Sequence, residues 1–245
     1  MSVERLAELI RERQPCVVLT GAGVSTESGI PDFRSPTGIW ARYDAMEYAS
    51  IDAFQRDPVK VWDFYARRLN MLVEAQPNAA HEALAELERV GWVTAIITQN
   101  IDTLHERAGS RAVVEVHGSI RTSSCLQCFT RVPLAGVVRL LDDAPAPACP
   151  TCGSVLKPDV VMFGELLPRA ATDRATQLAR EAALMLVVGS SLEVWPVAGL
   201  PLEAKSFAIV NRGPTALDGE AALRIDAPAG DTLAAVARLL REPLP

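Results

Sequence analysis

Two pairs of cysteines form a metal-binding pattern in this sequence. Cys125 and Cys128 make one Cys-x-x-Cys motif, Cys149 and Cys152 make a second, and twenty residues separate the two motifs. Four thiolates at this spacing can bind one zinc ion tetrahedrally, and a zinc held by four protein ligands keeps no open position for chemistry. We therefore predict one structural zinc ion. Cys16, the fifth cysteine, lies in an apolar run and is expected to be a small core residue.

A glycine-rich segment follows the first apolar run and could bind phosphate. It reads Gly21-Ala-Gly-Val-Ser-Thr-Glu-Ser-Gly-Ile-Pro-Asp-Phe-Arg34. Glycines between a strand and a helix let backbone N–H groups approach a pyrophosphate at the positive end of the helix. The segment departs from the usual dinucleotide pattern at Thr26, where a third glycine is expected, and it lacks the lysine of a P-loop. The spacing alone leaves a nucleotide site and an ordinary tight turn open.

The chain has three histidines, and histidine is the side chain best suited to act as a base near neutral pH. His117 directly follows the apolar run Val113–Val116. Open α/β sheets carry their sites at the carboxyl ends of the strands, so His117 is the candidate base. His81 and His105 lie in helical patterns, and we expect packing or capping roles for them.

The elements that must position these residues alternate between strands and helices. Short runs rich in Val and Ile predict strands covered on both faces at residues 16–20, 93–98, 113–116, 184–188 and 207–210. An amphipathic helix is predicted between Asn78 and Val90, with Gly91 as its stop. The alternation indicates an α/β fold with a Rossmann-like parallel sheet.

Two stretches interrupt this alternation and predict a smaller, zinc-binding domain formed by two insertions. Residues 37–76 contain a long helical pattern that begins near Pro58, and residues 119–157 contain the paired cysteines. We expect a helical module and a four-cysteine zinc ribbon that fold together. Residues 1–36, 77–118 and 158–245 are expected to form the large Rossmann-like domain.

Composition disfavours several classes of protein. The chain has 245 residues, enough for a sizeable core, and no apolar run approaches the ~18 residues of a membrane helix. A formal net charge of -6 disfavours a nucleic-acid binder. The first residues are charged and helix-periodic, without an export signal, so we expect a cytoplasmic, bacterial protein. We also expect a monomer.

In their order along the chain, the motifs resemble those of the sirtuin family. The matching segments are the glycine-rich segment, Thr98-Gln-Asn-Ile-Asp102, Val116-His-Gly118, both cysteine pairs, Met162-Phe-Gly-Glu165 and Gly189-Ser-Ser191, which together span nearly the whole chain. Sirtuins are NAD-dependent protein lysine deacylases with a large Rossmann domain and a small zinc-containing domain. The resemblance implies NAD as co-substrate, acylated-lysine proteins or peptides as partners, and release of nicotinamide and O-acyl-ADP-ribose.

The resemblance also implies roles for single residues. His117 would be the base that activates a ribose hydroxyl, Asn100 would position the ribose, and Asp102 would hold the nicotinamide carboxamide. Helix capping is the alternative for Asn100 and Asp102, and Asn100 could do both. The residues expected to contact NAD are Gly21, Ala22, Gly23, Ser25, Ser28, Asp32, Phe33, Arg34, Trp40, Gln99, Asn100, Ile101, Asp102, Gly189, Ser190, Ser191, Asn211, Arg212, Gly213 and Ala229.

The helix expected after Pro58 carries Tyr65 and Arg68, which are neighbours on one helix face. A guanidinium beside a phenol suits a carboxylate. The pair resembles the succinyl- and malonyl-lysine pocket of one sirtuin branch, which has a small residue where this chain has Ala49. We therefore expect removal of succinyl, malonyl and also acetyl groups. The alternatives are a core Tyr65 and a solvated Arg68 in an acetyl-only deacetylase.

The segment Val161, Met162, Phe163, Gly164 and Glu165 resembles the sirtuin segment that pairs with the extended peptide by strand addition. A plain core strand is the alternative for this segment. Three other functions stay open for the whole chain. They are a Rossmann dehydrogenase with a structural zinc, a zinc-ribbon module that binds nucleic acid, and an NAD-dependent ADP-ribosyltransferase.

Overall fold

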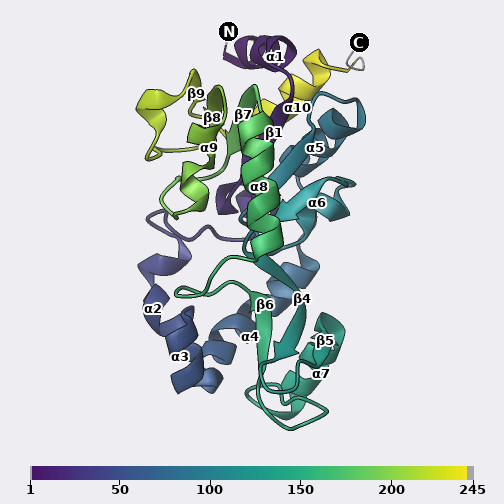
Figure 1. Ribbon diagram of the computed structural model, residues 1–245, viewed down its shortest axis with the longest axis vertical. Helices are drawn as coiled ribbons and strands as arrows, with labels where there is room; N and C mark the ends of the chain where they lie inside the picture. The colour runs from purple at the N-terminus through teal and green to yellow at the C-terminus, as the bar shows by residue number, and fades with distance from the viewer. Residues whose placement is uncertain (1, 242–245) are drawn as a thin grey trace.

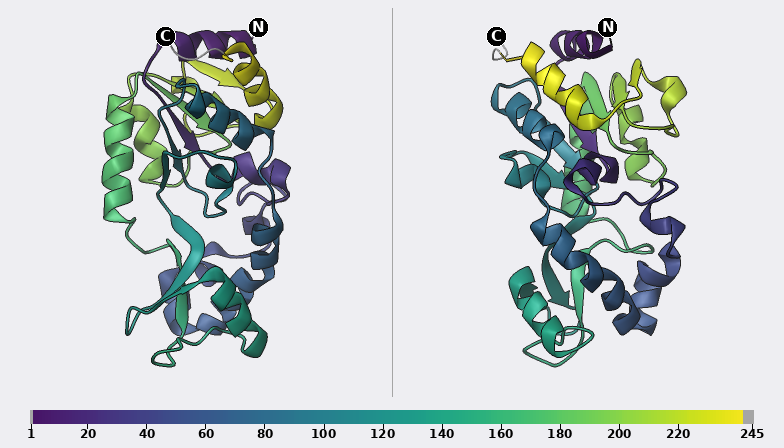
Figure 2. Two further views of the ribbon diagram at one scale, coloured as in Figure 1. Left: turned by 90° about the vertical axis from the view of Figure 1, so that its right-hand side faces the viewer. Right: turned by 180° about the vertical axis from the view of Figure 1, so that it is seen from behind.

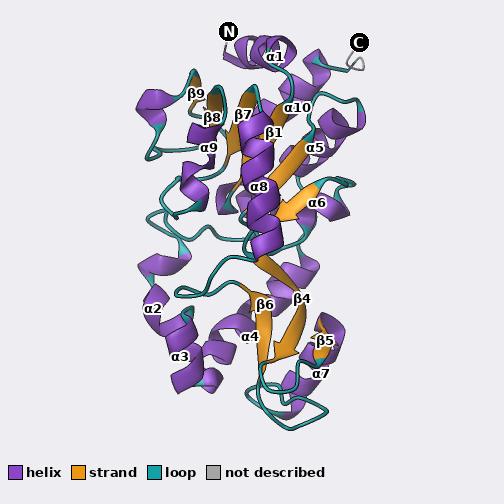
Figure 3. Ribbon diagram, viewed as in Figure 1, coloured by secondary structure: helices purple, strands orange, loops and turns teal. Residues whose placement is uncertain are grey.

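The computed structural model describes residues 2–241, and these residues contain two β-sheets (Figures 1 and 3). The strands of the larger sheet are β1 (Cys16–Thr20), β2 (Ala95–Thr98), β3 (Val113–Glu115), β7 (Leu184–Val188), β8 (Phe207–Val210) and β9 (Leu223–Ile225). Their order is β3-β2-β1-β7-β8-β9, and all neighbours are parallel. The direction of winding therefore reverses between β1 and β7, which makes this the topological switch point of the sheet.

The five apolar runs predicted as strands form β1, β2, β3, β7 and β8. The expectation that all five are covered on both faces is wrong for β3, which lies at the edge of the sheet with only half-buried residues. Residues 16–20, 184–188 and 207–210 are strands with the expected bounds, β2 begins at Ala95 rather than Val93, and β3 ends at Glu115. Every residue of β1, β2, β7 and β8 is buried, as expected for strands covered on both faces. The strand β9 was not predicted, because only Ile225 of its three residues is buried.

Helices cover both faces of the parallel sheet (Figure 2). One face packs against α1 (Ser2–Glu12), α5 (Ala79–Arg89) and α10 (Ala229–Leu239), and the other against α8 (Arg169–Glu181) and α9 (Leu200–Glu203). The short helix α6 (Leu104–Arg107) follows β2. The predicted helix between Asn78 and Val90 is confirmed as α5, with Asn78 as its N-cap. Within residues 2–241, no helix is long and apolar enough to cross a membrane.

The second sheet lies at the opposite end of the molecule from α1 (Figure 1). Its strands are β4 (Gly118–Cys125), β5 (Arg131–Pro133) and β6 (Leu156–Val160), and they pair antiparallel in the order β5-β4-β6. The helices around it are α2 (Ala45–Tyr48), α3 (Ile51–Arg56), α4 (Pro58–Glu74) and α7 (Leu134–Asp143). The long helix predicted near Pro58 is confirmed as α4, which begins at that proline.

The helices α2, α3 and α4 and the second sheet share one hydrophobic core. Trp62 of α4 is fully buried, and its indole Nε1–H donates a hydrogen bond of 2.7 Å to the carbonyl oxygen of Leu156 in β6. Two stretches that are distant in sequence are therefore joined by both apolar packing and a buried hydrogen bond.

The four paired cysteines meet at the end of the second sheet. Their sulfur atoms all lie within 4.8 Å of one another, with 3.4 Å between those of Cys125 and Cys152 and 3.5 Å between those of Cys128 and Cys149. Zinc–sulfur bonds of about 2.3 Å place neighbouring sulfurs about 3.8 Å apart in a tetrahedron. The cluster therefore fits one zinc ion with no free position. Cys16 is fully buried in β1, and burial raises the pKa of its thiol to about 12.

We expect Cys149→Ser to lower the zinc content of the purified protein from one ion per chain to a small fraction, because three thiolates bind the metal far more weakly than four. The melting temperature should fall with it, since the metal ties the two cysteine turns together. Elemental analysis and thermal melting measure both effects. Cys16→Ala is the matched control and should keep one zinc ion. Full zinc content in Cys149→Ser would contradict the assignment.

Candidate functional site

The candidate site begins where β1 and β7 end side by side. Gly21 donates its backbone N–H to the Val188 carbonyl at 3.1 Å, and Gly23 donates to the Gly189 carbonyl at 2.8 Å. A Cβ atom on Gly23 would lie only 2.8 Å from the Gly189 oxygen, so a larger residue would push the two loops apart. The glycines of the predicted phosphate loop thus serve backbone-to-backbone contact at the switch point of the sheet, where such folds bind ligands.

A buried polar cluster joins this loop to the residues after β2. The Ser25 hydroxyl donates a hydrogen bond of 2.7 Å to Asp102 Oδ2 and accepts one of 3.0 Å from Asn100 Nδ2. All three side chains are buried. Burial raises the pKa of the Asp102 carboxyl, against hydrogen bonds from Leu104, Ser25 and Asn100 that favour its charged form. The sequence therefore places one carboxylate and one amide together inside the site.

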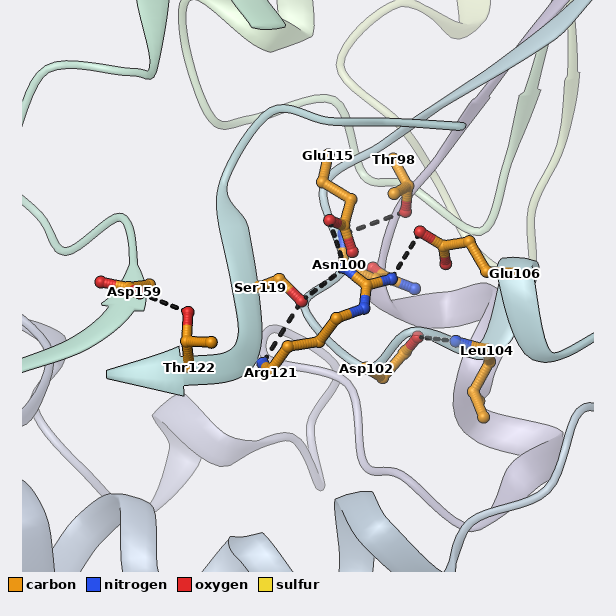
Figure 4. A network of polar contacts seen from close by, with 10 residues as sticks. All are labelled: Thr98, Asn100, Asp102, Leu104, Glu106, Glu115, Ser119, Arg121, Thr122 and Asp159. Carbon is orange, nitrogen blue, oxygen red and sulfur yellow. Dashed lines mark hydrogen bonds and ion pairs between the residues drawn. The ribbon is translucent and has the colours of Figure 1, made fainter. Parts of the chain in front are cut away.

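Thr103 is the N-cap residue of α6, and of the two residues with a capping alternative only Asp102 binds a backbone N–H of that helix. Asp102 Oδ1 accepts the backbone N–H of Leu104, the first residue of α6, at 2.9 Å (Figure 4). Asn100 does not cap: its backbone N–H donates to Thr98 Oγ1 at 3.1 Å, and its side chain contacts Ser25. The expectation that Asn100 could also cap a helix is wrong, because Thr103 is the N-cap residue of α6 and the Asn100 amide donates to Ser25 instead. The Asn100 side chain instead belongs to the polar cluster.

His81 and His105 lie behind this cluster with their rings 4.8 Å apart. His81 is part of the capping box of α5, which confirms its predicted capping role, and its Nε2 lies 3.5 Å from Ser25 Oγ. His105 Nε2 lies 2.9 Å from Thr20 Oγ1. Burial lowers the pKa of His81 to about 4 and that of His105 to about 3. Both rings are therefore neutral at pH 7, and they hold strand ends in place.

His117 lies in the connection from β3 to β4, where the chain passes from one sheet to the other. Its Nδ1 is 3.1 Å from the carbonyl oxygen of Gln99. A carbonyl only accepts hydrogen bonds, so Nδ1 carries the proton and Nε2 remains as the basic nitrogen. Burial lowers the pKa of His117 below the ordinary 6.5, and the Gln99 contact offsets only part of this shift. The imidazole is thus neutral at pH 7 and able to accept a proton.

The segment expected to pair with a peptide is a loop after β6 and not a strand. Phe163 donates its N–H to the Ala49 carbonyl at 2.9 Å and accepts from Ile51 at the same distance, and it bridges to Ser50. His117 accepts a backbone hydrogen bond from Val161 at 2.8 Å. The loop therefore connects the candidate base to the turn that carries Ala49.

The Glu165 side chain holds the shape of this loop. Its carboxylate accepts the Met162 N–H at 2.8 Å and pairs with Lys157 Nζ at 2.9 Å. Lys157 is buried and also donates to the carbonyls of Pro158 and Val160. The expected contact of Glu165 with the peptide stays a prediction, and its side chain also supports this loop. Lys157 was missed, although it is one of only three lysines and stands in an apolar run.

Arg68 of α4 lies between two aromatic rings, one from the same helix and one from the segment before it. Its guanidinium carbon is 3.8 Å from the centre of the Phe64 ring and 4.8 Å from that of the Tyr43 ring. The side chain also donates a hydrogen bond to the Phe64 carbonyl. Arg68 is half-buried, and no carboxylate of residues 2–241 forms an ion pair with it. The neighbouring Arg67 differs, because it is exposed and paired with Asp63 at 2.9 Å.

Tyr65 is buried, as the core alternative required, and packs edge-on against Trp62 and Phe64. Burial raises the pKa of its phenol, and the nearby charge of Arg68 lowers it by a smaller amount. The phenol therefore stays protonated and able to donate. Ala49 is also buried. Tyr43 was missed by sequence reasoning, because nothing in the pattern relates it to a helix that begins fifteen residues later.

The loop after Gly29 packs onto the same aromatic residues. Trp40 stacks on Phe64 with 5.8 Å between ring centres, and Phe33 and Phe163 contact its other sides. Arg34 pairs with Glu193 at 2.8 Å, which links the loop to the residues after β7. The loop that is expected to bind the cofactor therefore packs, through Trp40, against the same Phe64 ring that contacts Arg68.

The remaining residues expected to contact NAD lie along the carboxyl edge of the parallel strands. Gln99 Nε2 donates to Ser190 Oγ at 3.0 Å, across the ends of β2 and β7. The Asn211 side chain donates to the carbonyls of Arg212 and Gly213 and so shapes its own loop. Ala229 is the first residue of α10. Glycine contacts, short polar side chains and a buried amide–carboxylate cluster fit a dinucleotide at this edge of the sheet.

Comparisons with known proteins agree with this architecture. Residues 21–196 match the model of the Sir2 family. The chain is 43% identical over 245 residues to NAD-dependent protein deacylase 1 of Archaeoglobus fulgidus, covering 98% of this chain and 99% of that protein. It is 44% identical to NAD-dependent protein deacylase 2 of Pyrobaculum aerophilum, covering 93% and 92%.

Solved structures show the same similarity. A mutant Sir2 with a deacetylated p53 peptide and 3'-O-acetyl ADP ribose has a TM-score of 0.94 at 39% identity and covers 98% of both chains. A Sir2 complex with a p53 peptide and NAD+ has a TM-score of 0.92 at 38% identity, covering 98% and 99%. The resemblance predicted from the motifs is confirmed, and an ordinary dehydrogenase is excluded. The chain belongs to the Sir2 family and is an enzyme of its NAD-dependent protein deacylase and deacetylase class.

Proposed function

We propose that this Sir2 enzyme removes succinyl and malonyl groups, as well as acetyl groups, from lysine side chains of proteins and peptides. The observation that supports the proposal is the state of Arg68. A half-buried guanidinium with no carboxylate partner has lost part of its hydration without gaining a counter-charge. Burial accordingly lowers the pKa of Arg68. The carboxylate of an acidic acyl group would supply the missing partner.

The surroundings of Arg68 suit a chain that ends in a carboxylate. Phe64 and Tyr43 orient the planar guanidinium, so that its remaining N–H groups can bind both oxygens of one carboxylate. Tyr65 stays protonated and can donate a further hydrogen bond. Ala49 presents only a methyl group, and its carbonyl accepts the backbone N–H of Phe163 in the expected peptide segment. A short acetyl group needs none of these contacts and would still fit.

The proposed chemistry needs a base and a positioned ribose. NAD, when bound, would supply the ribose carbon that the acyl oxygen attacks, with nicotinamide as the leaving group. His117 would accept a ribose hydroxyl proton at Nε2, since its Nδ1–H is held by the Gln99 carbonyl. Asn100 and Asp102 would hold the ribose and the carboxamide, because Ser25 fixes both side chains from behind.

Arg68→Met should separate the two activities. We expect kcat/KM for succinyl- and malonyl-lysine peptides to fall about 10- to 100-fold, the equivalent of about 1.5–3 kcal/mol for hydrogen bonds to a charged group. The value for a matched acetyl-lysine peptide should change less than about threefold. Arg67→Met is the matched control on the adjacent position and should leave both values near those of the native enzyme, because Arg67 is exposed and faces Asp63.

Equal losses with all three peptides would show that Arg68 only supports the fold. A native enzyme that removes acetyl groups alone would contradict the proposed acyl range and leave an acetyl-only deacetylase. Mass spectrometry of the peptide products distinguishes these outcomes in one experiment.

The pH dependence should report the neutral state of His117. Its pKa is lowered, so the imidazole is neutral above that value and is lost as a base when the pH falls through it. We expect kcat/KM for the acyl peptide to be flat near pH 7 and to decline only below pH 6.5, the ordinary value for histidine. His117→Ala should abolish turnover. An acid decline centred above pH 7 would argue against this assignment.

A further inference from the structure

Arg121 joins three segments at the boundary between the two sheets (Figure 4). The residue lies on β4. Its Nη1 is 2.6 Å from Glu115 Oε2 at the end of β3 and 2.9 Å from Ser119 Oγ, and its Nη2 is 2.6 Å from Glu106 Oε1 in α6. One planar guanidinium therefore holds two carboxylates that come from different elements.

Each of these carboxylates belongs to an element that carries a site residue. Glu115 stands two residues before His117, in the strand that leads to it. Glu106 lies in α6, whose first backbone N–H is capped by Asp102. The backbone adds a third link, because Ile120 donates its N–H to the Ile101 carbonyl at 3.2 Å. Arg121 thus stands between the segment of the base and the segment of the nicotinamide residue.

The charges explain why a cation is required at this position. The Glu115 side chain is only 19% exposed, and its Oε1 has no hydrogen-bond partner among the described residues. Burial and the nearby Glu106 both raise the pKa of Glu115, against the influence of Arg121. Without the guanidinium, two neighbouring carboxylates would repel each other, and one would be buried without a counter-charge. The repulsion would displace β3 and α6 relative to each other.

We infer that Arg121 is a positioning residue for the deacylase reaction. It acts through Glu115 and Glu106 to hold His117 and Asp102 at a fixed separation while the chain crosses into β4. This inference rests on the deacylase activity and not on the proposed acyl range, since Arg121 and Arg68 share no hydrogen-bond or ion-pair partner among residues 2–241. The peptide loop at Val161–Glu165 has its own support from Lys157, so Arg121 should influence turnover more than peptide binding.

A double-mutant cycle on kcat with an acetyl-lysine peptide tests the inference. Arg121→Met should lower kcat about 10- to 100-fold, because a displacement of about 1 Å at a reacting group costs up to about 100-fold. The KM for the peptide should change less than about threefold. In a Glu115→Gln background the same substitution should lower kcat less than about threefold, because no buried carboxylate then requires the cation. Arg131→Met, another ion-paired arginine of the second sheet, is the matched control and should leave kcat unchanged.

The inference would be overturned if Arg121→Met lowered kcat by the same factor in the native and the Glu115→Gln backgrounds. An unchanged kcat in Arg121→Met would also overturn it. If Arg121→Met does not fold, Arg121→Lys replaces it in the same cycle. A lysine keeps the charge but cannot bridge both carboxylates, so an intermediate kcat is expected and a native kcat contradicts the role. The acetyl peptide keeps the tests separate, because failure of the acidic acyl range appears only with succinyl and malonyl peptides.

Discussion

The contact between the loops after β1 and β7 is the constraint on which the site depends. Gly189 adopts a φ of 62°, and a Cβ atom there would lie 2.2 Å from the backbone nitrogen of Val24. This backbone-to-backbone approach fixes the 3₁₀ helix Ala22–Ser28 at the switch point and places Ser25 against Asn100 and Asp102. It also explains the broken dinucleotide pattern. The Thr26 hydroxyl donates a hydrogen bond to the Gly23 carbonyl within this short helix. The third glycine of the usual pattern allows a long helix to pack closely on the sheet, and no long helix follows β1 here.

Burial then sets the electrostatics of the site. It lowers the pKa of all three histidines, so none is charged at pH 7, while the Asp102 carboxyl keeps hydrogen bonds from its neighbours. Three neutral histidines and the Asp102 carboxyl group suit a positively charged nicotinamide ring better than charged histidines would. Positive charge is concentrated instead at Arg68, on the far side of the aromatic residues, where an acidic acyl group would end. Phe64, which contacts Arg68, also stacks on Trp40, and Trp40 contacts Phe163.

Much of this arrangement could be predicted from the sequence because its signals are local. Buried strands, the cysteine pairs and the α4 and α5 boundaries follow from runs, spacing and caps within a few residues. The second sheet was not predicted, because β4 consists mostly of polar residues without regular alternation of burial, and its partner β6 follows only after α7. The contacts of Arg68 with Tyr43 and of Arg121 with Glu106 depend on packing between elements, for which no periodicity exists. The predicted domain boundaries and single-residue roles stay predictions.

A crystal structure with a succinyl-lysine peptide and an unreactive NAD analogue would test the account most directly. We expect both carboxylate oxygens within about 3 Å of the Arg68 guanidinium, with the Tyr65 hydroxyl as a further donor. We also expect a ribose hydroxyl within hydrogen-bond distance of His117 Nε2. A succinyl carboxylate in solvent, with Arg68 still bound only to its aromatic neighbours, would contradict the assignment of the acyl pocket.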